Sequence, residues 1–133
     1  MHCATADDLV DIPLFEGLDA DGRTEIAPWF EVQEISPGVR LIGEGCHGYT
    51  FFVLQDGSVT VSIDGVEVRT LGSGDFFGEL ALLGDGTRTA TVTTASPSRV
   101  LVLFGTEFRQ LQQKYPDIGE RIESGLRETA QVG

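Results

Sequence analysis

The central part of the chain alternates apolar and polar residues with a period of two. In "SVTVSI", Val59, Val61 and Ile63 alternate with small polar residues, as expected for a strand with one buried face. Similar short runs rich in β-branched and aromatic residues occupy 50–54, 66–71, 89–95 and 99–104. Several short strands at close spacing predict an all-β sandwich or barrel.

Glycine-containing turns separate these runs. Asp56-Gly57 and Asp64-Gly65 are both two-residue hairpin signals. Glycine makes up 17 of the 133 residues, about twice the ~7% average, and it falls between the apolar runs rather than within one segment. This distribution is typical of turns and not of disorder.

The two ends of the chain show the helical period instead. Asp19 is the expected N-cap of a helix over 20–30, which Pro28 limits at its end. Thr106 is the expected N-cap of the helix "EFRQLQQKY", and Pro116 opens another helix. That last helix repeats apolar residues every four positions, at Ile118, Ile122 and Leu126. The pattern therefore predicts a β-roll with one helical element before it and two after it.

Charge excludes one class of partner. The chain carries 21 Asp and Glu residues against 9 Lys and Arg, for a net charge of −12. Surfaces that bind nucleic acid are normally positive because phosphate contacts dominate that affinity. We therefore expect no direct binding of DNA or RNA.

Hydropathy and the N-terminus bear on the compartment. No run approaches the ~20 apolar residues of a membrane helix, so no membrane segment is expected. The N-terminus lacks a basic segment followed by an apolar stretch, which disfavours a signal peptide. We expect a cytoplasmic protein.

The inventory of reactive side chains disfavours catalysis and metal binding. Cys3 and Cys46 have no C-x-x-C spacing, so we expect two reduced thiols. His2 and His47 are the only histidines, too few for a cupin-type metal centre. No nucleophile with an oriented base suggests itself. We predict a protein that is not an enzyme and needs no cofactor.

The segment "GDFFGELALLGDGTRTATV" (74–92) carries the candidate chemistry. Gly78 precedes "ELALL", which predicts a short helix starting near Glu79. The first amides of a helix lack internal partners and attract an anion, and a glycine lets a ligand approach the backbone. A structural loop with a helical turn would explain the glycines equally well.

Arg88, nine residues after Glu79, sharpens this interpretation. A guanidinium facing a helix N-terminus could pair with a phosphate. Glu79 would repel phosphate but could accept a hydrogen bond from a sugar hydroxyl, as acids do in dinucleotide folds. Amides, one Arg and one Glu thus describe a ribose and a singly charged phosphodiester held together. A P-loop is excluded because the chain has no G-x-x-x-x-G-K-[ST].

This segment resembles the phosphate-binding cassette of cyclic nucleotide-binding domains. These are the regulatory modules of cAMP-dependent kinases, catabolite-activator-type regulators and cyclic nucleotide-gated channels. The resemblance rests on "FGELALL" followed by "RTAT", and it extends to "IPLFEGL", "PGVRLIGEG", "FFVLQDGSVTV" and "FRQLQQKYPDI". It implies a mainly β fold: an eight-stranded antiparallel β-roll of the double-stranded jelly-roll type. The single domain 1–133 would comprise a helical element (7–30), the roll (31–104) and two C-terminal helices (106–131).

The resemblance also assigns roles around the phosphate and the ribose. Gly78, Leu80 and Ala81 would provide backbone contacts around the cyclic phosphate. Glu79 would bind the ribose 2′-hydroxyl. Arg88 would pair with the exocyclic phosphate oxygens.

Four further residues would surround the base. Thr89 would place its hydroxyl near both phosphate and purine, and Ala90 would leave room there. Val61 and Val68 would form an apolar wall against the base. In the family, Ser or Thr at the Thr89 position can bond guanine, while Ala favours adenine. Many members with Ser or Thr nonetheless respond to cAMP, so we expect cAMP rather than cGMP.

The implied function is that of a sensor. Ligand binding would shift a population and move the C-terminal helices, which would act on an effector domain or protein outside these 133 residues. The C-terminal helix could also form a homodimer. Two alternatives stay open: a roll of the same fold that binds another small effector such as haem, for which Cys46-His47 is suggestive, or an interaction module that needs no ligand.

Overall fold

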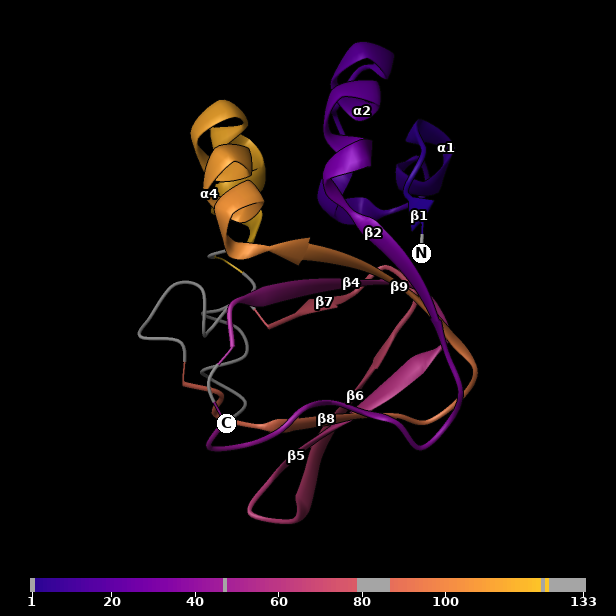
Figure 1. The fold of residues 1–133 in the computed structure, drawn as a ribbon, viewed down its shortest axis with the longest axis vertical. Coiled ribbons are helices and arrows are strands. Elements are labelled where there is room, and N and C mark those ends of the chain that lie inside the picture. The colour runs from indigo at the N-terminus through magenta and orange to yellow at the C-terminus, as the bar shows by residue number, and fades with distance from the viewer. Residues whose placement is uncertain (1, 47, 79–86, 123, 125–133) are drawn as a thin grey trace.

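The computed structural model describes residues 2–46, 48–78, 87–122 and 124. Within them, two antiparallel sheets form a roll, and the helices gather beyond one of the sheets (Figure 1). The predicted mainly β fold with an N-terminal helical element is confirmed.

The first sheet, here called sheet A, contains five of the described strands. Its order is β1-β2-β9-β4-β7. The strands are β1 (His2–Cys3), β2 (Glu31–Ile35), β9 (Ser98–Phe104), β4 (Thr50–Asp56) and β7 (Phe76–Phe77). β1 was not expected from the sequence. It precedes the N-terminal helices, so the predicted roll over 31–104 contains eight described strands, β2 to β9.

The second sheet, sheet B, contains the other four described strands. Its order is β3-β8-β5-β6. The strands are β3 (Arg40–Ile42), β8 (Thr91–Thr94), β5 (Ser58–Ile63) and β6 (Val66–Gly72). A β-bulge interrupts the pairing of β5 with β6 between Val61 and Ser62.

The helices flank the strands in the sequence and lie together on the outer side of sheet A (Figure 1). They are α1 (Ala6–Leu9), η1 (Pro13–Phe15), α2 (Ala20–Ile26), η2 (Ala27–Trp29) and α4 (Gly105–Lys114). Residues 116–122 are also helical. None of the helices in these described segments is both long and apolar enough to cross a membrane.

Two apolar clusters fill the molecule. The helix-side cluster lies between the helices and sheet A, and the roll cluster lies between the two sheets. β4 contributes side chains to both clusters, because Phe51 and Val53 belong to the helix-side cluster while Phe52 and Leu54 belong to the roll cluster. β9 does the same, with residues of alternating parity. Ile118 and Ile122 are buried in the helix-side cluster as predicted, and Leu126 lies outside the described residues.

The predicted N-terminal cap is confirmed. The Asp19 carboxylate accepts a hydrogen bond from the Gly22 amide at 2.7 Å, and α2 ends at Ile26, two residues before Pro28. The chain continues as the 3-10 turn η2, which contains Pro28 near its start. The proline has no amide to donate, so the α-helix ends four residues before the predicted end at residue 30.

Two local predictions were wrong. Asp56-Gly57 is not a hairpin, because β4 lies in sheet A and β5 in sheet B. The pairing of β4 with β9 shifts between Leu54 and Asp56, and such a bulge bends a strand out of its sheet. Thr106 does not cap α4, since the helix begins at Gly105 with Phe104 at the N-cap position.

The other hairpin signal was right. Asp64-Gly65 joins β5 to β6, which pair directly, and both residues have positive φ angles of 52° and 79°. These angles suit the two-residue turns whose twist matches that of the strands.

Polar contacts tie the N-terminal helices to the C-terminal ones. Glu25 of α2 accepts hydrogen bonds from Lys114 and from the Tyr115 hydroxyl. Glu25 raises the pKa of Tyr115 to about 12, mainly through that hydrogen bond. Arg121 donates to the backbone oxygen of Leu14 at 2.9 Å. Residues more than 85 positions apart thus meet over sheet A.

Candidate functional site

Arg88 lies just before β8 and is the centre of the candidate site. It is only 7% exposed, which is unusual for an arginine. Its Nη1 donates to the Gly78 backbone oxygen at 3.1 Å, and its Nη2 donates to the Thr50 backbone oxygen at 3.1 Å and to Thr50 Oγ1 at 2.8 Å. The guanidinium therefore bridges the end of β7 and the start of β4.

A turn at 43–46 holds the backbone of the same residue. The Arg88 amide donates to the Cys46 oxygen at 2.8 Å, and the Gly45 amide donates to the Arg88 oxygen at 2.9 Å. Gly45 has a φ of +82°, a conformation that favours glycine. Both the main chain and the side chain of Arg88 are thus fixed by segments far from it in sequence.

Gly78 is required by this geometry. It has a φ of +92°, and an added Cβ would lie 2.7 Å from the Thr50 backbone oxygen and 3.2 Å from Arg88 Nη1. Pairing of β4 with β7 brings Gly78 there, and the Phe52 and Phe77 rings stack at 4.9 Å next to it. The sequence indicated a close approach by a ligand. The structure adds a close approach by the protein's own backbone.

The four residues predicted to face the base lie in different settings. Val61 is buried in the roll cluster, and Ala90 packs against the same cluster. Thr89 is exposed and makes no hydrogen bond to another described residue. Val68 is 36% exposed and is the residue of β6 that the bulge leaves without a partner, next to Arg69, which pairs with Val61. Glu79, Leu80 and Ala81 lie outside the described residues.

Sequence reasoning missed two residues beside Arg88. Thr50 was assigned only to a strand, yet it supplies two of the acceptors of the guanidinium. Gly48 was not singled out, yet an added Cβ there would lie 2.9 Å from Arg88 Nη2. Both are about 40 positions from Arg88, and no local signal marked either.

The chemistry of the site suits an anion. Arginine remains protonated at all physiological pH values and presents a rigid planar set of donors that matches phosphate oxygens. The described hydrogen bonds of Arg88 go to uncharged oxygens of Thr50 and Gly78. These acceptors orient the guanidinium.

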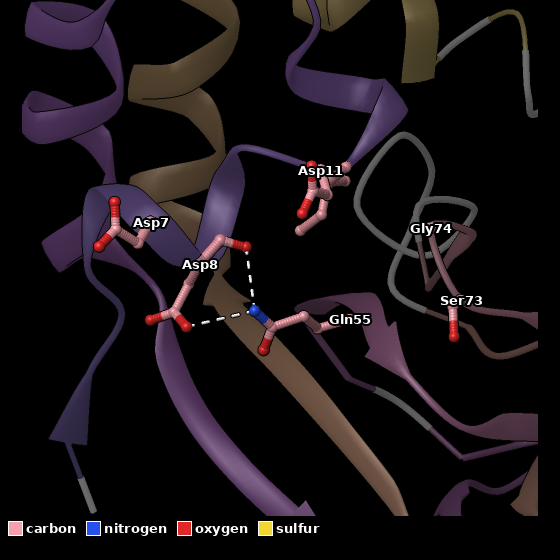
Figure 2. Close-up of a pocket in the computed structure, with 7 residues that line it drawn as sticks. Asp7, Asp8, Asp11, Gln55, Ser73 and Gly74 are labelled. Carbon is pink, nitrogen blue, oxygen red and sulfur yellow. Dashed lines mark hydrogen bonds between the residues drawn. The ribbon is translucent and has the colours of Figure 1, made fainter.

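A separate cavity of about 240 Å³ lies under α1. Figure 2 shows its lining, in which Gln55 points toward Asp8, and the residues are Asp7, Asp8, Asp11, Ile12, Gln55, Ser73 and Gly74. The Gln55 side-chain amide donates to the Asp8 backbone oxygen at 3.1 Å and to Oδ1 at 3.2 Å. Three aspartates make this cavity unsuited to phosphate.

Asp8 also fastens α1 to sheet A. Its Oδ1 lies 3.2 Å from Arg99 Nη2, and Arg99 Nε donates to Gln55 Oε1 at 2.5 Å. Burial tends to raise the pKa of the Asp8 carboxyl, but hydrogen bonds from Thr5, Gln55 and Arg99 outweigh burial and hold it below its ordinary value of 3.8. This network is a structural one.

Possible metal ligands do not gather in the described part of the chain. No group of three or more His, Cys, Asp or Glu there could hold a metal ion. Cys3 and Cys46 are both free and exposed. His47, which prompted the haem alternative, lies outside the described residues.

Comparison with known proteins places the site in context. The chain is 35% identical over 128 residues to a cAMP-dependent protein kinase regulatory subunit of Colletotrichum orbiculare, covering 88% of this chain and 33% of that protein. It is 34% identical over 126 residues to the cGMP-dependent protein kinase, isozyme 2 forms cD5/T2, of Drosophila melanogaster, covering 89% and 14%. The chain therefore spans a third or less of the length of these relatives.

A solved structure agrees with the sequence matches. The cAMP-bound PfPKA-R structure superposes with a TM-score of 0.86 at 30% identity, covering 96% of this chain and 44% of that one. The cyclic nucleotide-binding domain family matches residues 32–115, which include most of β2, all of sheet B and Arg88. The chain thus belongs to the cyclic nucleotide-binding domain family.

Proposed function

We propose that this chain is a sensor domain that binds a cyclic nucleotide, cAMP in preference to cGMP, and catalyses no reaction. The observation that carries the proposal is the buried Arg88, fixed by Gly78 and Thr50 at the end of β7. A cyclic phosphate carries one negative charge, which one guanidinium can match. Gly78, Glu79, Leu80 and Ala81 would complete the phosphate and ribose contacts.

The base would lie against sheet B. Val61 and Ala90 offer apolar surface there, and Val68 extends it at the edge of the sheet. The Thr89 hydroxyl is exposed beside Arg88, where a purine or a phosphate oxygen could reach it. Because the Thr89 hydroxyl could bond a phosphate oxygen as well as a guanine, its presence does not require cGMP, and cAMP is the ligand that we propose.

We further propose that binding is transmitted to the C-terminal helices. A series of aromatic contacts supports this route from the site to α4. Phe76, two residues before Gly78, contacts Phe51 with ring centroids 5.6 Å apart, and Phe51 contacts Phe108 of α4 at 5.4 Å. A shift of the segment after Gly78 would therefore reach α4 through packed side chains. The effector would be a partner of these helices, in a cytoplasmic setting.

Calorimetric titration with cAMP and with cGMP tests the binding proposal, with 5′-AMP as a ligand that lacks the cyclic phosphodiester. We expect saturable binding of cAMP, weaker binding of cGMP and none of 5′-AMP. Failure of both cyclic nucleotides to bind would contradict the proposal and favour an interaction module of the same fold.

Arg88→Ala tests the assigned site. Losing one partner of a buried charge pair typically costs about 2–5 kcal/mol, so affinity should fall roughly 30-fold to several thousand-fold. Arg109→Ala is the matched control, because Arg109 is exposed on α4 and removes the same charge elsewhere. Unchanged affinity in Arg88→Ala would mean that the site is wrongly placed.

Hydrogen exchange tests the transmission. We expect amide protection over 106–130 to change between the ligand-free and cAMP-bound protein. Identical protection in both states would rule out transmission through these helices while leaving the binding proposal intact.

A further inference from the structure

The first residue of β4 gives Arg88 a side-chain acceptor. Arg88 Nη2 donates to Thr50 Oγ1 at 2.8 Å, a shorter distance than the 3.1 Å to either backbone oxygen. Any residue at these positions would supply the backbone oxygens. Only Ser or Thr would supply a hydroxyl at that point, so position 50 carries a chemical requirement of its own.

The sheet fixes where this hydroxyl lies. Thr50 pairs with Phe104 of β9, and Phe52, two residues on, pairs with Phe77 of β7. Thr50 shares its strand face with Phe52, which lies in the roll cluster. A β-branched side chain also has few χ1 rotamers. The position of Oγ1 therefore follows from β4 itself and does not depend on a bound ligand.

Gly48 limits the guanidinium on another side. An added Cβ at Gly48 would lie 2.9 Å from Nη2, 3.0 Å from Nε and 3.3 Å from Cζ. The first of these distances is shorter than real Cβ contacts and the other two are tight, so the guanidinium lies directly against Gly48. It is fixed by its hydrogen bond to Thr50 Oγ1 and by contact with Gly48.

We propose that Thr50 is the positioning residue of the anion-binding arginine. Its hydroxyl fixes the rotation of the guanidinium so that a cyclic phosphate meets it in one orientation, with Gly48 preventing the alternative positions. Groups that are held before binding lose less entropy when the ligand arrives. This inference rests on the proposed function, because it concerns how the same site takes a cyclic phosphate.

Thr50→Val removes the hydroxyl and keeps the branched shape, so it is the main test. A hydrogen bond to a charged group contributes enough that we expect cAMP to bind roughly 3- to 30-fold more weakly. Thr50→Ser restores the hydroxyl and should bind within about threefold of the wild type. Thr60→Val is the matched control, because Thr60 alternates with the buried Val59 and Val61 and faces away from the roll cluster.

A second readout separates positioning from packing. The two phosphorothioate diastereomers of cAMP differ only in which exocyclic phosphate oxygen is replaced by sulfur. A fixed guanidinium should prefer one of them, and a guanidinium free to rotate should discriminate less. We expect the ratio of the two affinities to move toward one in Thr50→Val and to stay at the wild-type value in Thr50→Ser and Thr60→Val.

Gly48→Ala displaces the same group without touching Thr50, and it decides the question if Thr50→Val does not fold. We expect roughly tenfold weaker cAMP binding and a reduced diastereomer ratio. Gly72→Ala is its control, since an added Cβ there meets no atom within 4 Å.

The outcomes are distinct. Wild-type affinity and an unchanged diastereomer ratio in Thr50→Val would overturn the positioning role, as would equal weakening of both diastereomers. If Thr50→Val fails to fold, an unchanged diastereomer ratio in Gly48→Ala would overturn it in the same way. A wild-type chain that binds neither cAMP nor its analogues would overturn the proposed function itself, and this inference with it.

Discussion

The two sheets of the roll are buried to different extents. Sheet A has an apolar cluster on each face, and four consecutive residues of β4 are buried as a result. Sheet B has a cluster on one face only, and β5 alternates buried and partly exposed residues. β6, at the edge of sheet B, exposes Val66 by 63%.

This difference indicates which sheet holds the Arg88 site in place. The start of β4 and the end of β7, which hold Arg88, both belong to the doubly covered sheet A. The predicted base contacts come from sheet B and the residues leading into it. Sheet A therefore orients the charge, and sheet B supplies the more tolerant apolar surface.

Truncation of a β4 side chain that packs under the helices should have the largest effect. Phe51 is fully buried and contacts the rings of Phe76 and Phe108, so Phe51→Ala should lower the free energy of unfolding by about 3–5 kcal/mol. Val66→Ala on sheet B should change it by no more than about 0.5 kcal/mol. Denaturant unfolding measures both, and comparable losses would break the contrast between the sheets.

Alanine substitutions at two glycines with positive φ compare the stability cost of changing a turn in sheet A and a turn in sheet B. Gly78→Ala should cost about 2–3 kcal/mol of stability, because the strained φ adds to a clash of Cβ with the Thr50 oxygen at 2.7 Å. Gly65→Ala, in the sheet B hairpin, meets no atom within 4 Å and should pay only the φ term, about 1 kcal/mol. Equal melting temperatures of the two variants would show that the close approach at Gly78 carries no cost.

The smallest effect should come from the helix that covers sheet A. Asp8→Asn weakens the contact with Arg99 and should cost about 0.5–1.5 kcal/mol at neutral pH. The Asp8 pKa is lowered on folding, so its stabilisation is present above the ordinary value of 3.8 and is lost as the pH falls through the lower folded pKa. The wild type and Asp8→Asn should therefore converge in acid.

The control is Asp64→Asn in the sheet B turn. Asn tolerates positive φ, so this variant should match the wild type within about 0.5 kcal/mol at every pH tested. Urea unfolding across the acid range distinguishes the two substitutions. If the difference in unfolding free energy between the wild type and Asp8→Asn persists at low pH, the charge of the carboxylate does not explain it.

The sequence predicted the site where its residues lie close together in the chain. Gly78 and Arg88 are ten positions apart, and their types alone indicate an anion contact. Thr50 and Gly48 were missed because their role depends on the pairing of β4 with β7, which no local pattern encodes. The strand residues of β5 were predicted from their alternation, which one-sided burial produces.

The errors have a common physical cause. A two-residue turn signal at Asp56-Gly57 reports local backbone geometry, and it does not say whether the next strand joins the same sheet. β4 leaves sheet A through a bulge and a Gly57 with φ of +108°, so an identical signal gives a corner rather than a hairpin. Likewise, β1 has two residues and is defined by its pairing with β2.

The alternation of β4 and β9 between the two clusters has a consequence for folding. Because neighbouring residues of one strand belong to opposite clusters, neither cluster can lose its packing while the other keeps its strands in place. The helical layer and the roll therefore form one cooperative unit, despite being built from separate parts of the chain. A domain of this kind unfolds as a whole, and a ligand that stabilises the roll also stabilises the seating of the helices.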